Sequence, residues 1–306
     1  MVHVRQLDPS ASPLEYFGFE ARRLREAAGM TLEQLGKVIY CTGSLIGQVE
    51  TAAKVPSRVF AEALDAAFMT DGFFSRLLGL VLRSQLPNWF QPYADMEAKA
   101  AFISTYQCQV VHGLLQTPEY AAALMAVEYP PDKVEELVAA RMERQRILLR
   151  KQPPAVWVVL DEAVLLREVG GREVMRRQLT RLLAYRDDPW VNVQVLPFTA
   201  GVHTGLMGSF NLLRFEDDPD IYYSESYDEA HMTANSQVIR ERSVAYARLQ
   251  ADALPVEESA DLIARVLGER YGDRTDAVTP GRPPAEPSSP STVPAARTSS
   301  THSRCK

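Results

Sequence analysis

Apolar residues recur at helical spacing through the first quarter of the chain. Phe17, Ala21 and Leu24 fall on one face, and Gly29 is expected to end this first helix in a left-handed conformation. The pattern predicts an amphipathic helix that needs other elements to cover its apolar face. The arginines off this face, expected to form an ordinary charged surface, are Arg22, Arg23 and Arg25.

The next apolar segment is short and begins with a capping signal. Thr31-Leu32-Glu33-Gln34 has the form of a capping box, in which the threonine and glutamine side chains satisfy free N–H groups at a helix start. A second helix is therefore predicted over residues 32–38. Leu35 and Val38 are expected to point inward.

A third helix is predicted over residues 43–50, after a short turn. Thr42 can cap it, and Ile46 and Val49 are expected to face the core. Two short helices joined by a tight turn and braced by a preceding helix match the helix-turn-helix plan. A fourth helix should follow the cap Ser57 and bury the stripe Phe60, Leu64, Ala67 and Phe68.

This arrangement suits DNA because the major groove is wide enough to accept an α-helix. The third helix has an apolar back and a polar front, and the front would meet the edges of the bases. Gln48 can pair with adenine, and helix N-termini offer N–H groups to phosphate oxygens. The candidate base contacts are Gly43, Ser44, Gly47 and Gln48. The candidate contacts to the DNA backbone are Thr31, Lys37, Thr42, Lys54 and Arg58.

The short helical patterns end at Leu86-Pro87-Asn88-Trp89, where we place a domain boundary, and strand patterns appear after it. The run AVWVVL at residues 155–160 is short and continuously apolar, as in a central buried strand. Val191, Val193 and Val195 alternate with polar residues, which predicts a half-buried strand. A helical repeat between the two runs makes this a strand–helix–strand unit.

An antiparallel hairpin is predicted from residues 208–215 and 221–227. Helices are predicted over residues 97–111, 117–127, 132–151, 235–253 and 257–271. The expected fold class is multidomain: an all-α helix-turn-helix domain, followed by an α+β domain with a small mixed sheet.

The chain therefore divides into four predicted regions. Residues 1–12 are a flexible N-terminus, 13–83 bind DNA, and 88–272 form an effector and dimerisation domain. Residues 273–306 contain six prolines, six serines and five threonines but no Leu, Ile, Phe, Tyr or Trp, so this tail is expected to be disordered.

Composition narrows the class of protein. The 306 residues carry a net charge of −6, which argues against a general polyanion binder and makes any contact with nucleic acid local. Three separated cysteines fit neither a disulfide framework nor a four-ligand zinc site, and the five histidines lack metal-ligand spacing. With no signal-peptide or membrane-span pattern, a cytoplasmic protein without cofactor, metal or membrane partner is expected.

The residues resemble a known family. LEQLGKVIYCTGSLIGQVET at 32–51 and KVPSRVFAEALDAAF at 54–68 resemble the Xre/Cro-type helix-turn-helix domain, particularly the version found in actinobacterial-type regulators. The resemblance extends into the uncharacterised effector domain of those regulators. It is carried by HGLLQTPEYAAALM at 112–125, RMERQRILLR at 141–150, VWVVLDEAVLLREVGG at 156–171 and VNVQVLPFTAGVHTGLMGSF at 191–210.

This resemblance implies a homodimeric, DNA-binding transcriptional regulator of the antitoxin-like type, often encoded beside a small partner protein. The chain departs from the family pattern at Ala52, where glycine is usual, and at Leu32, where many relatives place glutamine. An alanine in a left-handed cap costs on the order of 1 kcal/mol, so the cap is expected to be rearranged. Residues 14–83 carry eight acids and eight bases, so specific binding should depend on dimerisation.

Two other classes of function compete with DNA binding. A protein-binding adaptor or antitoxin that has lost DNA binding would use Leu32 as part of a partner surface. An enzyme is not expected, because the G-x-S-x-G, P-loop, G-x-G-x-x-G and H-E-x-x-H motifs are absent from the sequence.

Four side chains are candidates for catalysis, but simpler interpretations are favoured. Asp161 follows a strand but is expected to cap a helix, and His203 lies in a glycine-bearing loop. Cys108 and His112 are four residues apart on a predicted helix, where we expect a buried cysteine beside a partly exposed histidine.

Overall fold

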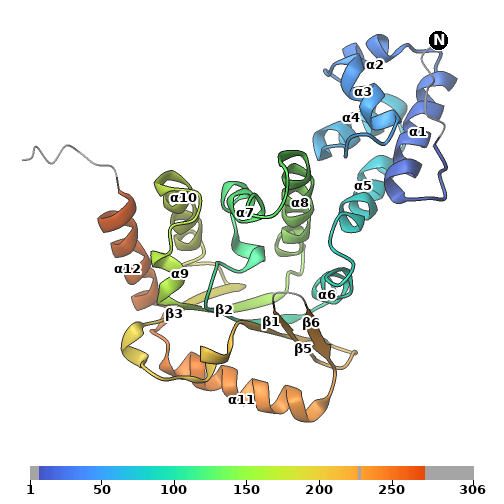
Figure 1. Cartoon of the computed structure of the whole chain (residues 1–306). Helices are drawn as coiled ribbons and strands as arrows, with labels where there is room; N and C mark the ends of the chain where they lie inside the picture. Colours follow the sequence, from blue (N-terminus) through green and yellow to red (C-terminus); the bar gives the residue numbers. More distant parts are fainter. Residues whose placement is uncertain (1–6, 227–228, 273–306) are drawn as a thin grey trace, which may run out of the picture. The chain divides into compact units, whose positions relative to one another are not determined.

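The computed structural model describes residues 7–226 and 229–272 (Figure 1). Its N-terminal part is helical throughout. The helices are α1 (Pro13–Ala27), α2 (Leu32–Val38), α3 (Gly43–Glu50), α4 (Arg58–Phe68) and α5 (Phe73–Ser84). Of the predicted flexible N-terminus 1–12, residues 1–6 lie outside the described residues, as does the whole predicted disordered tail 273–306.

The N-terminal helices assemble around a continuous apolar core. Phe17, Leu35, Ile46 and Leu64 are fully buried, so α1 to α4 each contribute to it. The ring of Phe17 also lies 5.1 Å from that of Phe74, which joins α1 to α5. These apolar residues, which the helical spacing predicted to face inward, are therefore buried in the core.

One inward-facing residue was predicted wrongly. Val38 is 48% exposed, and its neighbour Ile39 is buried instead. The helix α2 has only seven residues, and Ile39 is its C-cap. Ile39 lies four residues after Leu35, and both spacings of three and four share a helix face, so spacing alone did not decide between them.

The remaining residues form a second, mixed part. Its strands are β1 (Phe102–Gln107), β2 (Ala155–Asp161), β3 (Val191–Leu196), β4 (Phe210–Arg214), β5 (Ile221–Glu225) and β6 (Ala230–Thr233). Its α-helices are α6 (Gln91–Glu97), α7 (Pro118–Met125), α8 (Pro131–Arg144), α9 (Glu162–Leu166), α10 (Arg172–Leu183), α11 (Ser236–Asp252) and α12 (Val256–Val266). The short helical turns are η1 (Gly113–Leu115), η2 (Gln145–Leu149), η3 (Phe198–Ala200), η4 (Thr204–Met207) and η5 (Leu267–Tyr271).

The six strands form one mixed sheet in the order β3-β2-β1-β4-β5-β6. The pairs β1–β2 and β2–β3 are parallel, whereas β1–β4, β4–β5 and β5–β6 are antiparallel. Figure 1 shows α7, α8 and α10 on one face of the sheet and α11 on the other. The expected all-α domain followed by an α+β domain with a mixed sheet is confirmed.

The central strand β1 corrects a prediction. The sequence pattern predicted a helix over residues 97–111, but the chain forms α6 before Ala98 and then the strand β1. Residues 103–106 are buried on both faces of the sheet, so they show none of the alternation that marks a half-buried strand. Phe102, Ile103, Thr105 and Tyr106 are residue types that favour strands, and this was the signal available.

The sheet is covered by a different core on each face. Ile103 of β1 belongs to the large cluster under α7, α8 and α10, whereas Tyr106 belongs to a smaller cluster with Leu249 of α11. The large cluster also continues into the N-terminal helices. The strands predicted at 155–160 and 191–195 and the hairpin β4–β5 are confirmed, while β6 was not foreseen.

The turn after α3 keeps the conformation that glycine would favour. Ala52 has φ +54° and its N–H donates to the Val49 carbonyl, so the expected rearrangement of this cap does not occur. An alanine in this region is strained by roughly 1–2 kcal/mol. Alanine in place of the family's usual glycine at position 52 therefore strains the backbone of this turn.

We expect Ala52→Gly to stabilise α3 locally by about 0.5–1 kcal/mol, because relief of strain exceeds the entropy that glycine adds to the unfolded chain. Amide hydrogen exchange across α3 should slow by about two- to fivefold. The matched control is Ala53→Gly, because Ala53 is not among the described residues with positive φ. Equal exchange in Ala52→Gly and wild type would contradict the strain at this turn.

Candidate nucleic-acid interface

The turn between α2 and α3 is closed by a tight backbone contact. A Cβ added at Gly36 would lie 2.6 Å from the Cys41 carbonyl oxygen, and the Cys41 N–H donates to the Gly36 carbonyl at 2.9 Å. Only glycine permits this approach. The turn passes through Tyr40, which has φ +56° and a side chain that is 97% exposed. These contacts set the angle between the two helices of the motif.

Side-chain caps begin both helices, as the sequence predicts. The Thr31 hydroxyl accepts from the Gln34 N–H at 3.2 Å, and the Gln34 side chain accepts from the Thr31 N–H at 2.7 Å. The Thr42 hydroxyl accepts from the Leu45 N–H at 3.2 Å. Both threonines are exposed at the starts of their helices.

A buried ion pair holds α3 against α1. Glu50, at the end of α3, is 2% exposed, and its carboxylate accepts from Arg25 Nε at 2.6 Å and from a terminal nitrogen of the same guanidinium at 2.8 Å. The hydrogen bond that Arg25 donates to Glu50 raises the pKa of Arg25. Arg25 also donates to the Met30 carbonyl at 2.8 Å. Arg25 is therefore a brace between helices, and the expectation that it belongs to an ordinary charged surface is wrong.

The predicted polar front of α3 is open. Ser44 and Gln48 are exposed on α3, while Ile46 and Val49 are fully buried on its back. Gly43 and Gly47 are half-buried and face α2: an added Cβ would lie 3.2 Å from Glu33 N and 3.5 Å from a Leu32 methyl, respectively. The two polar side chains are thus the members of the base-contact set that reach solvent.

Leu32 lies at the contact between α2 and α3. Its side chain is half-buried, packs against the core cluster and approaches Gly47. A glutamine at this position would place a polar group over the same contact. Leu32 therefore contributes packing within the motif.

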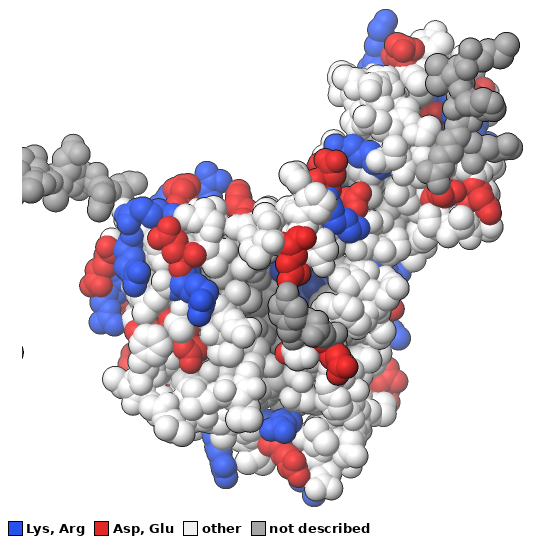
Figure 2. All heavy atoms as spheres, viewed as in Figure 1, with Lys and Arg blue, Asp and Glu red and all other residues white. Residues whose placement is uncertain are grey.

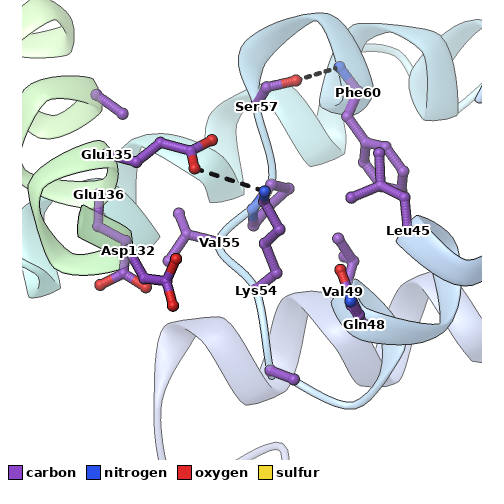
Figure 3. Close-up of a pocket in the computed structure, with 13 residues that line it drawn as sticks. Leu45, Gln48, Val49, Lys54, Val55, Ser57, Phe60, Asp132, Glu135 and Glu136 are labelled. Carbon is purple, nitrogen blue, oxygen red and sulfur yellow. Dashed lines mark hydrogen bonds and ion pairs between the residues drawn. The ribbon is translucent and has the colours of Figure 1, made fainter. Parts of the chain in front are cut away.

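The three predicted cations differ in what they contact. Lys37 is exposed. Lys54 Nζ lies 3.5 Å from Glu135 of α8, and Figure 3 shows this pair across a cavity of about 470 Å³ that Gln48 also lines. Arg58 donates to both carboxylate oxygens of Glu143, also on α8, at 2.7 and 2.6 Å. Two of the cations assigned to DNA phosphates are thus paired with carboxylates of the second part.

Charge around the interface is mixed. Asp132 and Glu136 line the same cavity as Lys54 and Glu135. Figure 2 likewise shows acidic and basic side chains intermingled on the face in view. Electrostatic attraction to phosphate should therefore be weak until the carboxylates of α8 release their partners.

The structure brings together two residues considered as catalytic candidates. Asp161 caps α9 by accepting from the Ala163 N–H at 2.9 Å, as predicted, and its carboxylate lies 3.8 Å from His203 Nε2. The Tyr106 hydroxyl donates to the same carboxylate at 3.2 Å. Tyr106 lies near the end of β1, Asp161 ends β2, and His203 lies in the loop before η4, so only the fold revealed their proximity.

Cys108 and His112 do not share a helix, which corrects their predicted arrangement. Cys108 follows β1, with its Sγ 3.4 Å from Ser209 Oγ. His112 is the buried member of the pair, and burial lowers its pKa to about 4, so the imidazole is neutral at physiological pH.

Within the described ranges, no helix is long and apolar enough to cross a membrane. No group of three or more His, Cys, Asp and Glu side chains in the same ranges is arranged to hold a metal ion.

Comparison with protein families matches two parts of the chain. Residues 90–265, more than half of the sequence, match the family described as a domain of unknown function (DUF5753). The chain belongs to the DUF5753 family. Residues 17–72 match a helix-turn-helix domain, which indicates DNA binding and regulation of transcription. No curated protein and no solved structure matches the chain.

We expect Glu143→Gln to strengthen DNA binding by about two- to fivefold at low salt, because Arg58 is released for a phosphate. Fluorescence anisotropy across a salt series should show a slope steeper by about one unit. The control Glu173→Gln removes the same charge from α10, where Glu173 pairs with Arg176 and Arg177, and should leave the slope unchanged. Identical behaviour of the two variants would show that Arg58 does not reach DNA.

Proposed function

We propose that this DUF5753-family chain is a sequence-specific regulator of the Xre/Cro type, probing the major groove with α3. The supporting observation is the two-sided burial of α3: Ile46 and Val49 are fully buried, while Ser44 and Gln48 are exposed on the same eight-residue helix. A helix anchored in this way can present a polar row to base edges without rearrangement of the core.

The finer parts of this function follow from the resemblance and from charge. We propose a homodimer, because a neutral module needs two half-sites to gain affinity. We further propose an antitoxin-like regulator that acts with a small partner protein, and no catalytic activity of its own.

Substitution of Gln48 tests the groove-facing role. We expect Gln48→Ala to weaken binding to the specific site by about 1–3 kcal/mol and to relax the preference at one base pair. The readout is binding to a library of operator variants. Gln237→Ala is the matched control, because Gln237 is exposed on α11 and, among residues 7–226 and 229–272, its side chain bonds only to Glu241. Equal affinity and selectivity in both variants would remove Gln48 from the interface.

A protein-binding adaptor is the second candidate, favoured by the pairing of Lys54 with Glu135 and of Arg58 with Glu143. The two functions predict different salt dependence. A DNA reader should bind its own upstream DNA with a log K that falls by roughly 0.9 per phosphate contact for each tenfold rise in salt. The footprint should cover two half-sites about one helical turn apart. An adaptor would give no footprint and no salt-dependent binding.

A further inference from the structure

A second cavity of interest lies beside β1, where the sheet changes from parallel to antiparallel pairing. The strand β1 is parallel to β2 on one side and antiparallel to β4 on the other. The strand order also reverses at β1, since the chain runs outward through β2 and β3 and then returns to β4 on the other side of β1. In open α/β sheets, ligands bind where the strand order reverses. A cavity of about 330 Å³ lies there, lined by Gln107 at the end of β1 and by Ser209 and Asn211 at the start of β4. We call it the switch-point cavity.

The switch-point cavity contains a guanidinium, that of Arg141, which has no carboxylate partner in the part of the chain that the structure describes. Arg141, in the last turn of α8, is half-buried, and its one hydrogen bond within the described residues is to Gln116 Oε1 at 2.7 Å. The neighbouring Glu97 is engaged by Arg144 at 2.6 Å. Burial, followed by repulsion from Arg144, lowers the pKa of Arg141 to about 10. A buried charge with so few partners raises the free energy of the folded protein unless an anion pairs with it.

The surrounding backbone is held in place before any ligand arrives. Gln116 Nε2 donates to the Val111 carbonyl at 2.6 Å, and Gln145 Nε2 donates to the Gly113 and Gln116 carbonyls, each at 2.8 Å. These bonds fasten the segment after β1 to α8 and orient Gln116 toward Arg141. A preorganised site of this kind loses little entropy on binding.

The far wall offers neutral donors and an apolar surface. The Asn211 side-chain oxygen accepts from the Thr105 hydroxyl at 2.5 Å and from Gln107 Nε2 at 3.3 Å, which leaves the Asn211 NH₂ group as a donor. The rings of Tyr93 and Tyr223 stack beside it, with centroids 3.9 Å apart. A ligand can therefore place an anionic group near Arg141 and a carbon skeleton along the tyrosines.

We propose that the switch-point cavity binds a small organic anion, whose carboxylate or phosphate group pairs with Arg141 and accepts a hydrogen bond from Asn211. The proposal does not depend on DNA binding, because every residue that carries it belongs to the second part of the chain. The volume is within the range of small-molecule sites. The exposed Glu225 also lines the cavity, and its carboxylate accepts from the Tyr223 hydroxyl at 2.7 Å.

The direct test is calorimetry on the full-length protein with succinate, citrate and 3-phosphoglycerate at concentrations up to about 10 mM. Succinamide is the uncharged counterpart. We expect one of the three anions to bind with one site per chain, succinamide not to bind, and Arg141→Gln to weaken the anion about ten- to hundredfold. Arg177→Gln, which removes an exposed arginine paired with Glu119 and Glu173, should bind as wild type.

Two further measurements separate a ligand contact from a structural role. Without ligand, Arg141→Gln should melt at or above the temperature of wild type, because it removes a poorly paired buried charge. Asn211→Asp preserves the shape of the wall and adds a repelling charge, so it should also weaken the anion. Binding of none of the three anions, unchanged binding by Arg141→Gln or equal loss in Arg177→Gln would overturn the proposal. A large fall in melting temperature for Arg141→Gln would likewise assign that residue to stability alone.

Discussion

An eight-residue helix has little stability of its own, so its position in a protein is set by what it packs against. The orientation of α3 therefore depends on the burial of Ile46 and Val49 and on the ion pair between Arg25 and Glu50. The apolar contacts fix which side faces inward, and the ion pair fixes the end of the helix against α1. The polar front is exposed as a consequence, because the same helix cannot bury both sides in this small module.

The cations Lys54 and Arg58 at the interface are paired with carboxylates. A DNA-binding module is expected to carry free cations, yet Lys54 and Arg58 contact carboxylates of α8. The helix α8 also carries Arg141 and Arg144, which lie at the switch-point cavity. One helix thus contacts the DNA-binding part through Glu135 and Glu143 and lines a cavity in the second part. Packing of α5 against α8 adds an apolar connection between the two.

The mixed sheet explains why the cavity exists. Parallel strands need long crossovers, which place α7, α8 and α10 on one face, whereas the antiparallel β4 arrives from the other side of β1. Helices cannot cover the point where the two connection patterns diverge, and polar groups from β1, β4 and α8 meet there. The parallel pair β1–β2 places Tyr106 near Asp161, and the loop before η4 brings His203 to the same carboxylate.

Local signals in the sequence determined much of the N-terminal part. Caps at Thr31, Thr42 and Ser57 are short-range interactions, so three or four consecutive residues specify them. The left-handed turn at Ala52 is also a local feature, yet the sequence suggested a rearrangement, because strain was weighed without the contacts that hold the turn.

Only the tertiary structure decided the features that join distant residues. Residues 102–107 form a strand because β2 and β4 flank them. The paired positions Phe102 and Ala155 are 53 positions apart in the sequence, so periodicity cannot reveal the pairing. The partners of Arg25, Arg58 and Arg141 were equally invisible, since an arginine on a helix has the same sequence signature whether it meets water, a carboxylate or a cavity. Short-range hydrogen bonds and apolar spacing involve neighbouring residues, so the sequence alone determines them. Burial and charge pairing depend on which distant segments the fold brings together.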